Sequence, residues 1–318
     1  MTVLVTGSLA YDTLMTHEGK FQDSIIPGEL DHLNVAFLIQ HKEVEFGGCG
    51  GNIAYNLALL GEDVDLIGRA GRDFRDYEEW LLENGINTDH ITIHEDTDTA
   101  VAYITTDSKL NQLTSFYPGA MGKETDGFFP NKSKDYSLAI IAPENTYWME
   151  QAVGYCRDHM PFIFDPGQQM TALDADFLIS AARSAKVLVV GDYEFDLMKK
   201  KTGMRATMLT SLCPTFIVTH GVKGSTIYHK GTVIEVGIAV PREVLDPTGC
   251  GDAYRAGLAA GMACRFDWEL TGQIAATMGS FAVEAYGTQN HFFTLEEFNE
   301  RLFANFGKRV NLEDGTQS

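Results

Sequence analysis

The sequence predicts an α/β protein in which helices cover both faces of a doubly wound, mostly parallel sheet, with a small β-sheet as a lid. Short apolar runs rich in β-branched residues recur along the chain, as expected for strands buried on both faces. Helical patterns lie between these runs, and such alternation is typical of a parallel sheet. Two segments, near residues 13–46 and 97–119, break the alternation and predict the lid.

Six apolar runs are the expected strands of the main sheet: Val3–Thr6, Val64–Ile67, Leu138–Ala142, Phe162–Phe164, Val187–Val190 and Phe216–Thr219. A helix is predicted over residues 52–60, where Ile53, Leu57 and Leu60 share one face. Gly61 follows where a helix commonly ends on a glycine. These elements fit one domain over residues 1–318, because no repeat or interdomain linker interrupts them.

The lid is predicted from two kinds of segment. Residues 13–46 contain no convincing helix, whereas residues 99–118 alternate in polarity around the polar turn "DSKLN" and predict a β-hairpin. The two segments could pair into one sheet that closes over a cleft. The alternative to a lid is that the two segments are unrelated surface loops.

Composition excludes several functional classes. The 318 residues carry a net charge of −20 with a pI near 4.7, which argues against nucleic-acid binding because that binding relies on clustered Lys and Arg. No run approaches the roughly 18 apolar residues of a membrane span, and the first residues fit a strand better than a signal peptide. A cytoplasmic protein without membrane partners is expected. The five cysteines form no C-x-x-C pair, so neither a disulfide framework nor a zinc site is expected.

The stretch "DPTGCGDA" carries the strongest chemical signal. Gly249, Cys250 and Gly251 can bring backbone N–H groups together at the start of a helix, where the helix dipole favours an anion. Asp252 follows at once. A capping role is the simpler explanation for such an aspartate, but an anion hole beside a base suits phosphoryl transfer to a hydroxyl group.

A second glycine cluster, "FGGCGGN", precedes the helix at residues 52–60. The Walker A pattern is absent, and the dinucleotide pattern fails because its third glycine would fall on Ile53. Asp12 ends the first strand region, and Asn52 offers both a donor and an acceptor. Because ligands of open α/β sheets bind at the carboxyl ends of the strands, both side chains could hold adjacent hydroxyls. A turn aspartate and a capping asparagine are the commoner explanations.

Together these two clusters resemble the ribokinase-like (PfkB) carbohydrate kinases, and the resemblance runs from "GSLAYD" to "GTQNH". It implies that Asp252 is the catalytic base and that residues 249–251 form the anion hole. The positions that hold the sugar hydroxyls in the family correspond to Asp12, Gly48 and Asn52.

The resemblance also implies ATP and Mg²⁺ as cofactors and leaves open whether a monovalent cation takes part. The expected ATP-site residues are Thr219, Gly221 and Gly224 in "VTHGVKGS", together with Asn290 in "GTQNH". In "VVGDYE", Glu194 is expected to organise Mg²⁺ through water. Gly191 departs from the family pattern, which has Asn there, and Asp192 could compensate.

Within the family, "SFYPGAM" and "GTQNH" resemble the adenosine and nucleoside kinase branch. The lid aromatics Phe37, Phe116 and Tyr117 could stack on a purine, with core packing as the alternative. Lys109 is the only basic residue from 99 to 119, which favours an uncharged acceptor. The prediction is a monomeric or homodimeric kinase of the 5′-hydroxyl of a purine nucleoside, adenosine first. A kinase of free ribose or fructose and a non-catalytic nucleoside-binding module are the alternatives.

Overall fold

The computed structural model describes residues 2–24, 35–109, 111–125, 129, 135–312 and 314–317. Its main sheet has nine strands in the order β13-β12-β11-β10-β9-β8-β1-β4-β5, parallel except for the pairings of β12 and β13. The strands are β1 Thr2–Thr6, β4 Asp63–Gly71, β5 Ile86–His94, β8 Leu138–Ile141, β9 Phe162–Phe164, β10 Val187–Gly191, β11 Thr215–Thr219, β12 Ser225–His229 and β13 Thr232–Val236. All six predicted strands are confirmed. The predicted set lacked β5, β12 and β13.

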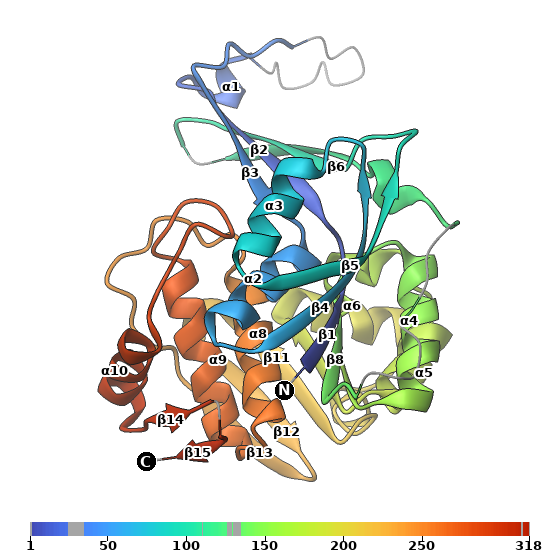
Figure 1. Ribbon diagram of the computed structural model, residues 1–318, viewed down its shortest axis with the longest axis vertical. Coiled ribbons are helices and arrows are strands. Elements are labelled where there is room, and N and C mark those ends of the chain that lie inside the picture. The colour runs from blue at the N-terminus through green and yellow to red at the C-terminus, as the bar shows by residue number, and fades with distance from the viewer. Residues whose placement is uncertain are drawn as a thin grey trace.

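Helices cover both faces of this sheet (Figure 1). They are α2 Cys49–Leu59, α3 Arg75–Glu83, α4 Thr146–His159, α5 Ala175–Ser184, α6 Asp192–Thr202, α7 Ala206–Leu209, α8 Cys250–Ala263, α9 Trp268–Ala282 and α10 Leu295–Phe306. Because side chains alternate along a strand, Val3 and Val5 of β1 join the core under α2, α8 and α9, whereas Leu4 joins the core under α4–α6. The doubly wound architecture is thereby confirmed.

A separate four-stranded sheet, here called the lid sheet, lies beyond the main sheet at the top of Figure 1. Its order is β3-β2-β6-β7, with β2 Ala10–Thr16, β3 His41–Gly47, β6 Ala100–Thr106 and β7 Gln112–Tyr117. The predicted hairpin is β6–β7, and β2 pairs with β6 as expected for one small sheet. A single helical turn, α1 Phe21–Ser24, also lies in the first lid segment. Residues 25–34 of the predicted lid lie outside the described residues.

The strand order places the site. The chain builds outward from β1 through β4 to β5, then returns to pair β8 on the other side of β1. Ligands of open α/β sheets bind where this order reverses, outside the carboxyl ends of the strands. Just past the carboxyl end of β1, Gly7 packs against Gly50 so closely that a Cβ on either would come within 3 Å of the other's backbone. The amino end of α2 is therefore held at the point of reversal.

None of the helices in the described ranges is both long enough and apolar enough to cross a membrane.

Candidate active site

Asp252 lies in the first turn of α8, directly after the predicted anion hole. Gly249 caps this helix at φ 76°, a left-handed conformation that favours glycine, and a Cβ there would meet Thr288 at 3.0 Å. The N–H groups of Gly251 and Asp252 belong to the turn in which a helix provides no acceptor of its own. The preceding loop is fixed by Asp246, which accepts hydrogen bonds from the N–H groups of Thr248 at 2.9 Å and Gly287 at 3.1 Å. The Cys250 N–H group donates to the Pro247 carbonyl at 3.3 Å, and the assignment of residues 249–251 as an anion hole stays a prediction.

The Asp252 carboxylate is held by Asn52, whose Nδ2 donates to Oδ2 at 2.8 Å. Burial raises the pKa of Asp252 above its ordinary value, opposed by this hydrogen bond and by the positive charge of Arg255. Asn52 is almost fully buried in the first turn of α2. That helix begins after Gly48 at φ 84°, where a Cβ would come within 2.5 Å of the Ser8 carbonyl oxygen. The start of α2 therefore brings Asn52 to Asp252, while Gly48 packs against Ser8 and Ala10, and the predicted binding of sugar hydroxyls by both residues stays a prediction.

Asp12, on β2, completes a group of acidic side chains. Burial raises its pKa to about 7, and the charges of Asp252, Asp246 and Glu45 add to the increase. Glu45 lies opposite Asp12 in the register of β2 and β3. Four carboxyl groups around one position disfavour a substrate that is itself anionic.

Of the three lid aromatics, Phe116 lies on the same face of the lid sheet as Asp12. Asp12 pairs with Ala102 across β2–β6, and Ala102 pairs with Phe116 across β6–β7, so the three side chains share one face of the lid sheet. Phe116 is 51% exposed. Tyr117 lies on the opposite face and bonds to Thr97, and Phe37 packs against Phe21 at the lid tip.

The predicted ATP-site glycines form a tight turn after β11. Thr219 ends that strand, Gly221 and Gly224 have φ values of 56° and 90°, and a Cβ on Gly224 would overlap the Val236 carbonyl. The next residue, Ser225, accepts a 2.7 Å hydrogen bond from the Tyr254 hydroxyl on α8. This bond links the turn to α8, the helix that follows the predicted anion hole.

Glu194 lies at the start of α6, near this turn. Its Oε2 accepts the Gly191 N–H at 2.6 Å, which leaves the second carboxylate oxygen for another ligand. Among the residues that the structure describes, no group of three His, Cys, Asp or Glu side chains could hold a metal by itself. A single carboxylate fits Mg²⁺ that is bound mainly by phosphates and water. Asp192, the residue that could compensate for Gly191, is hydrogen-bonded to His220 at 2.6 Å, across the turn after β11.

Asn290 lies elsewhere. Its Nδ2 donates to Glu45 on the lid sheet at 2.7 Å and to the Tyr286 carbonyl at 2.9 Å, so its amide is bound on the lid side of the site. Its assignment to ATP stays a prediction.

Two buried features escaped the sequence reasoning. Arg255 makes an ion pair with Asp165, which follows β9, and its Nη1 donates to the Gly251 carbonyl at 3.0 Å. Gln289 donates to Asn52 and accepts from Trp80. An arginine one turn after Asp252, in a helix of small residues, is a signal that could have indicated a buried ion pair such as that of Arg255.

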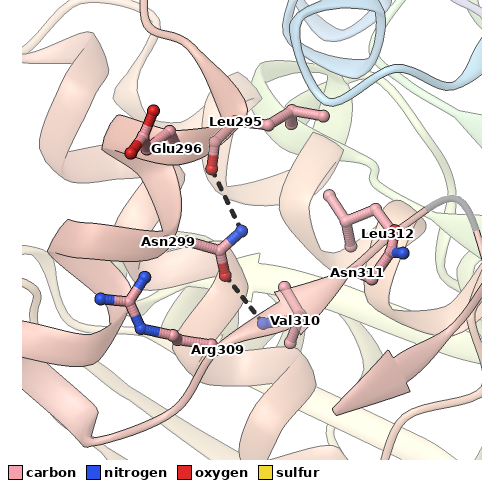
Figure 2. Close-up of a pocket in the computed structure, with 7 residues that line it drawn as sticks. All are labelled: Leu295, Glu296, Asn299, Arg309, Val310, Asn311 and Leu312. Atoms are coloured by element: carbon pink, nitrogen blue, oxygen red, sulfur yellow. Dashed lines mark hydrogen bonds between the residues drawn. The ribbon is translucent and has the colours of Figure 1, made fainter. Parts of the chain in front are cut away.

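A shallow hollow lies between α10 and the C-terminal strand β14 Val310–Asn311, as Figure 2 shows. Asn299 spans it, donating to the Leu295 carbonyl and accepting the Val310 N–H. None of the candidate catalytic residues lines this hollow, so it is separate from the site at Asp252.

Comparisons with known proteins agree with this geometry. The sequence profile of the pfkB family carbohydrate kinases matches residues 8–294. A nucleoside kinase from Methanocaldococcus jannaschii is 31% identical over 273 residues, covering 85% of this chain and 89% of its own. The solved nucleoside kinase of Burkholderia thailandensis in complex with inosine is 36% identical, with a TM-score of 0.85 over 96% of this chain and 99% of its own. The same enzyme has also been solved in complex with ADP-inosine, at 36% identity and a TM-score of 0.83 over 96% of this chain and 97% of its own. The chain therefore belongs to the pfkB family of carbohydrate kinases.

Proposed function

We propose that the protein uses ATP and Mg²⁺ to phosphorylate the 5′-hydroxyl group of a purine nucleoside. The observation that carries this proposal is the contact between Asn52 and Asp252, because it places a carboxylate in the first turn of α8 at the convergence of the two glycine clusters. Asp252 is then positioned to accept a proton beside the backbone N–H groups that would bind the transferred phosphoryl group.

Each part of the site has its own role in the phosphoryl transfer. Asp252 takes the proton as the hydroxyl oxygen bonds to the γ-phosphorus, and the bond from that phosphorus to the β,γ-bridging oxygen breaks to release ADP. A pKa raised by burial makes Asp252 a stronger base than an exposed aspartate. The first turn of α8 stabilises negative charge on the phosphoryl oxygens. Glu194 would help hold Mg²⁺ through water, and the bound ion would neutralise charge on the phosphates.

Three features support a nucleoside as the acceptor. The acidic surroundings of Asp12 favour an acceptor without charge. Asp12 would accept hydrogen bonds from ribose hydroxyls. Phe116, on the same face of the lid sheet, offers a ring on which a base can stack. The relatives named above are nucleoside kinases, and one of them binds inosine. Adenosine and inosine are therefore the first acceptors to test.

The test is ADP release from ATP and Mg²⁺ with adenosine, inosine, guanosine, cytidine, ribose and fructose, using the wild type and Asp252→Asn. We expect turnover on purine nucleosides and a fall in kcat of at least about 100-fold in the variant, the usual contribution of a positioned base. Asp158→Asn, which makes the same change at an exposed carboxylate on α4, serves as the matched control.

Near-normal turnover by Asp252→Asn would contradict the assigned base. Turnover on ribose or fructose alone would contradict the nucleoside as acceptor while leaving the phosphoryl transfer intact. Nucleoside binding without ADP production would identify a binding module.

A further inference from the structure

A chain of side-chain hydrogen bonds leads from Trp80 to the proposed base. The Trp80 indole Nε1 donates to Gln289 Oε1 at 3.0 Å, and Gln289 Nε2 donates to Asn52 Oδ1 at 3.0 Å. Asn52 Nδ2 then donates to Asp252 Oδ2 at 2.8 Å. We call these four residues the relay. Gln289 and Asn52 are both nearly inaccessible to water, at 2% and 3% exposure, so water does not readily replace these partners.

The direction of the relay follows from the chemistry of its ends. An indole N–H is only a donor, so the Gln289 amide must turn its oxygen toward Trp80 and its NH₂ group toward Asn52. Asn52 must then present its oxygen to Gln289 and its NH₂ group to Asp252. An ionised carboxylate is only an acceptor, so Asp252 can accept the hydrogen bond with which the relay ends.

Tyr77 reinforces the same direction. Its hydroxyl donates to the Gly47 carbonyl at 2.9 Å and is therefore free to accept from Gln289 Nε2 at 2.6 Å. Both N–H groups of the Gln289 amide are thereby used, one by Tyr77 and one by Asn52. Stacking of Trp80 on Phe46 and Tyr55 holds the indole in place.

We propose that Trp80 and Gln289 are positioning residues, which fix the Asn52 amide so that it donates to the carboxylate of Asp252. With the opposite orientation, Asn52 would direct its carbonyl oxygen at the carboxylate and repel it. The inference rests on the proposed role of Asp252 and adds how the base is held ionised and in one orientation. Asn52 accordingly serves the base as well as the acceptor hydroxyls predicted for it.

Loss of the donated hydrogen bond should raise the pKa of Asp252, because that bond favours the charged form. The other ionisable groups that act on Asp252, or on which it acts, are Asp12, Cys49, Tyr77, Asp165, Cys250 and Arg255. Trp80 and Gln289 carry no charge, so replacing them with uncharged side chains adds no new charge to this set. A shift of the pH profile can then be assigned to the relay.

The experiment compares Gln289→Met and Trp80→Phe with the wild type, measuring kcat/KM for the nucleoside against pH. Gln289→Met keeps an unbranched side chain of similar size but loses the donor. We expect the acid limb of the profile to move up by about one pH unit, and kcat/KM on that limb to fall about tenfold. Trp80→Phe should move it in the same direction by less, because Tyr77 still orients Gln289. The double variant should be no worse than Gln289→Met alone, since both act through one chain.

Matched controls separate positioning from general destabilisation. Gln273→Met replaces a buried glutamine of α9, and Trp268→Phe replaces a tryptophan that packs against His229. Both should leave the acid limb in place even if the melting temperature falls. A folded Gln289→Met or Trp80→Phe protein with an unmoved acid limb would overturn the relay. If Gln289→Met does not fold, Trp80→Phe decides alone. Retained turnover by Asp252→Asn would instead overturn the proposed base.

Discussion

At the scale of single residues, the site combines groups that have opposite effects on the ionisation of its carboxyl groups. Asp12 and Asp252 belong to different elements, yet the charge of Asp252 disfavours ionisation of Asp12. The hydrogen bond from Asn52 and the positive charge of Arg255 favour the charged form of Asp252, whereas Asp12 has acidic neighbours. Burial raises the pKa of both carboxyl groups, and at Asp252 a donated hydrogen bond and a neighbouring positive charge oppose this increase.

The raised pKa of Asp12 predicts a pH-dependent effect on stability. Its folded-state value of about 7 exceeds the ordinary value, so the folded protein binds the extra proton and is favoured at low pH. That contribution is lost as pH rises through about 7. Asp12→Asn should therefore raise the melting temperature more at pH 8 than at pH 5, while weakening nucleoside binding.

Differential scanning calorimetry at the two pH values checks this expectation, with the exposed Asp158→Asn as control. Equal shifts at pH 5 and pH 8 would show that ionisation of Asp12 is not responsible.

At the scale of elements, the start of α2 matters most, because it brings Asn52 to Asp252. The helix can start there only because Gly48 adopts φ 84° against the backbone of Ser8 and Ala10. Gly61, just after the same helix, has φ 81° but nothing within 4 Å of a Cβ. The two glycines share a conformation and differ in the space around them.

This difference predicts unequal effects of the same substitution. Gly61→Ala should cost about 1 kcal/mol of unfolding free energy, from backbone strain alone. Gly48→Ala should cost roughly 1 kcal/mol more, since its Cβ must displace backbone atoms, and should also lower kcat because Asn52 and Asp252 separate. Urea denaturation and kcat measured on both variants check this. Similar losses in stability and activity for both would contradict the steric argument.

At the scale of the whole molecule, a net charge of −20 surrounds a site that would bind ATP, itself an anion. Only local features such as the first turn of α8 oppose this field. Dissolved salt screens the long-range repulsion more than it weakens the short contacts.

Raising the salt concentration from about 10 mM to about 150 mM should therefore lower the KM for ATP, by about two- to fivefold, while the KM for the uncharged nucleoside stays nearly constant. Steady-state kinetics with each substrate varied in turn measure both, so the nucleoside is an internal control. An ATP KM that rises with salt would show that local positive groups dominate the field.

The sequence by itself determined six of the nine strands of the main sheet, the β6–β7 hairpin and the glycine clusters beside α2 and α8, although α2 begins at Cys49, three residues before the predicted start. Each of these depends on neighbours along the chain: apolar runs, polarity alternation, or glycines beside a helix start. Local pattern was also enough to nominate Asn52 and Asp252, since each lies in the first turn of a helix. Asp12 was nominated as the end of the first strand region, whereas it lies within β2 of the lid sheet.

Only the tertiary structure decided what those residues touch. Asn52 meets Asp252 across 200 positions and Gln289 across 237, and Arg255 reaches Asp165 across 90. Whether a side chain in the lid faces the site depended likewise on strand register, which selects Phe116 over Tyr117. A hydrogen bond between buried groups depends on how whole elements pack, and no local pattern in the sequence encodes it.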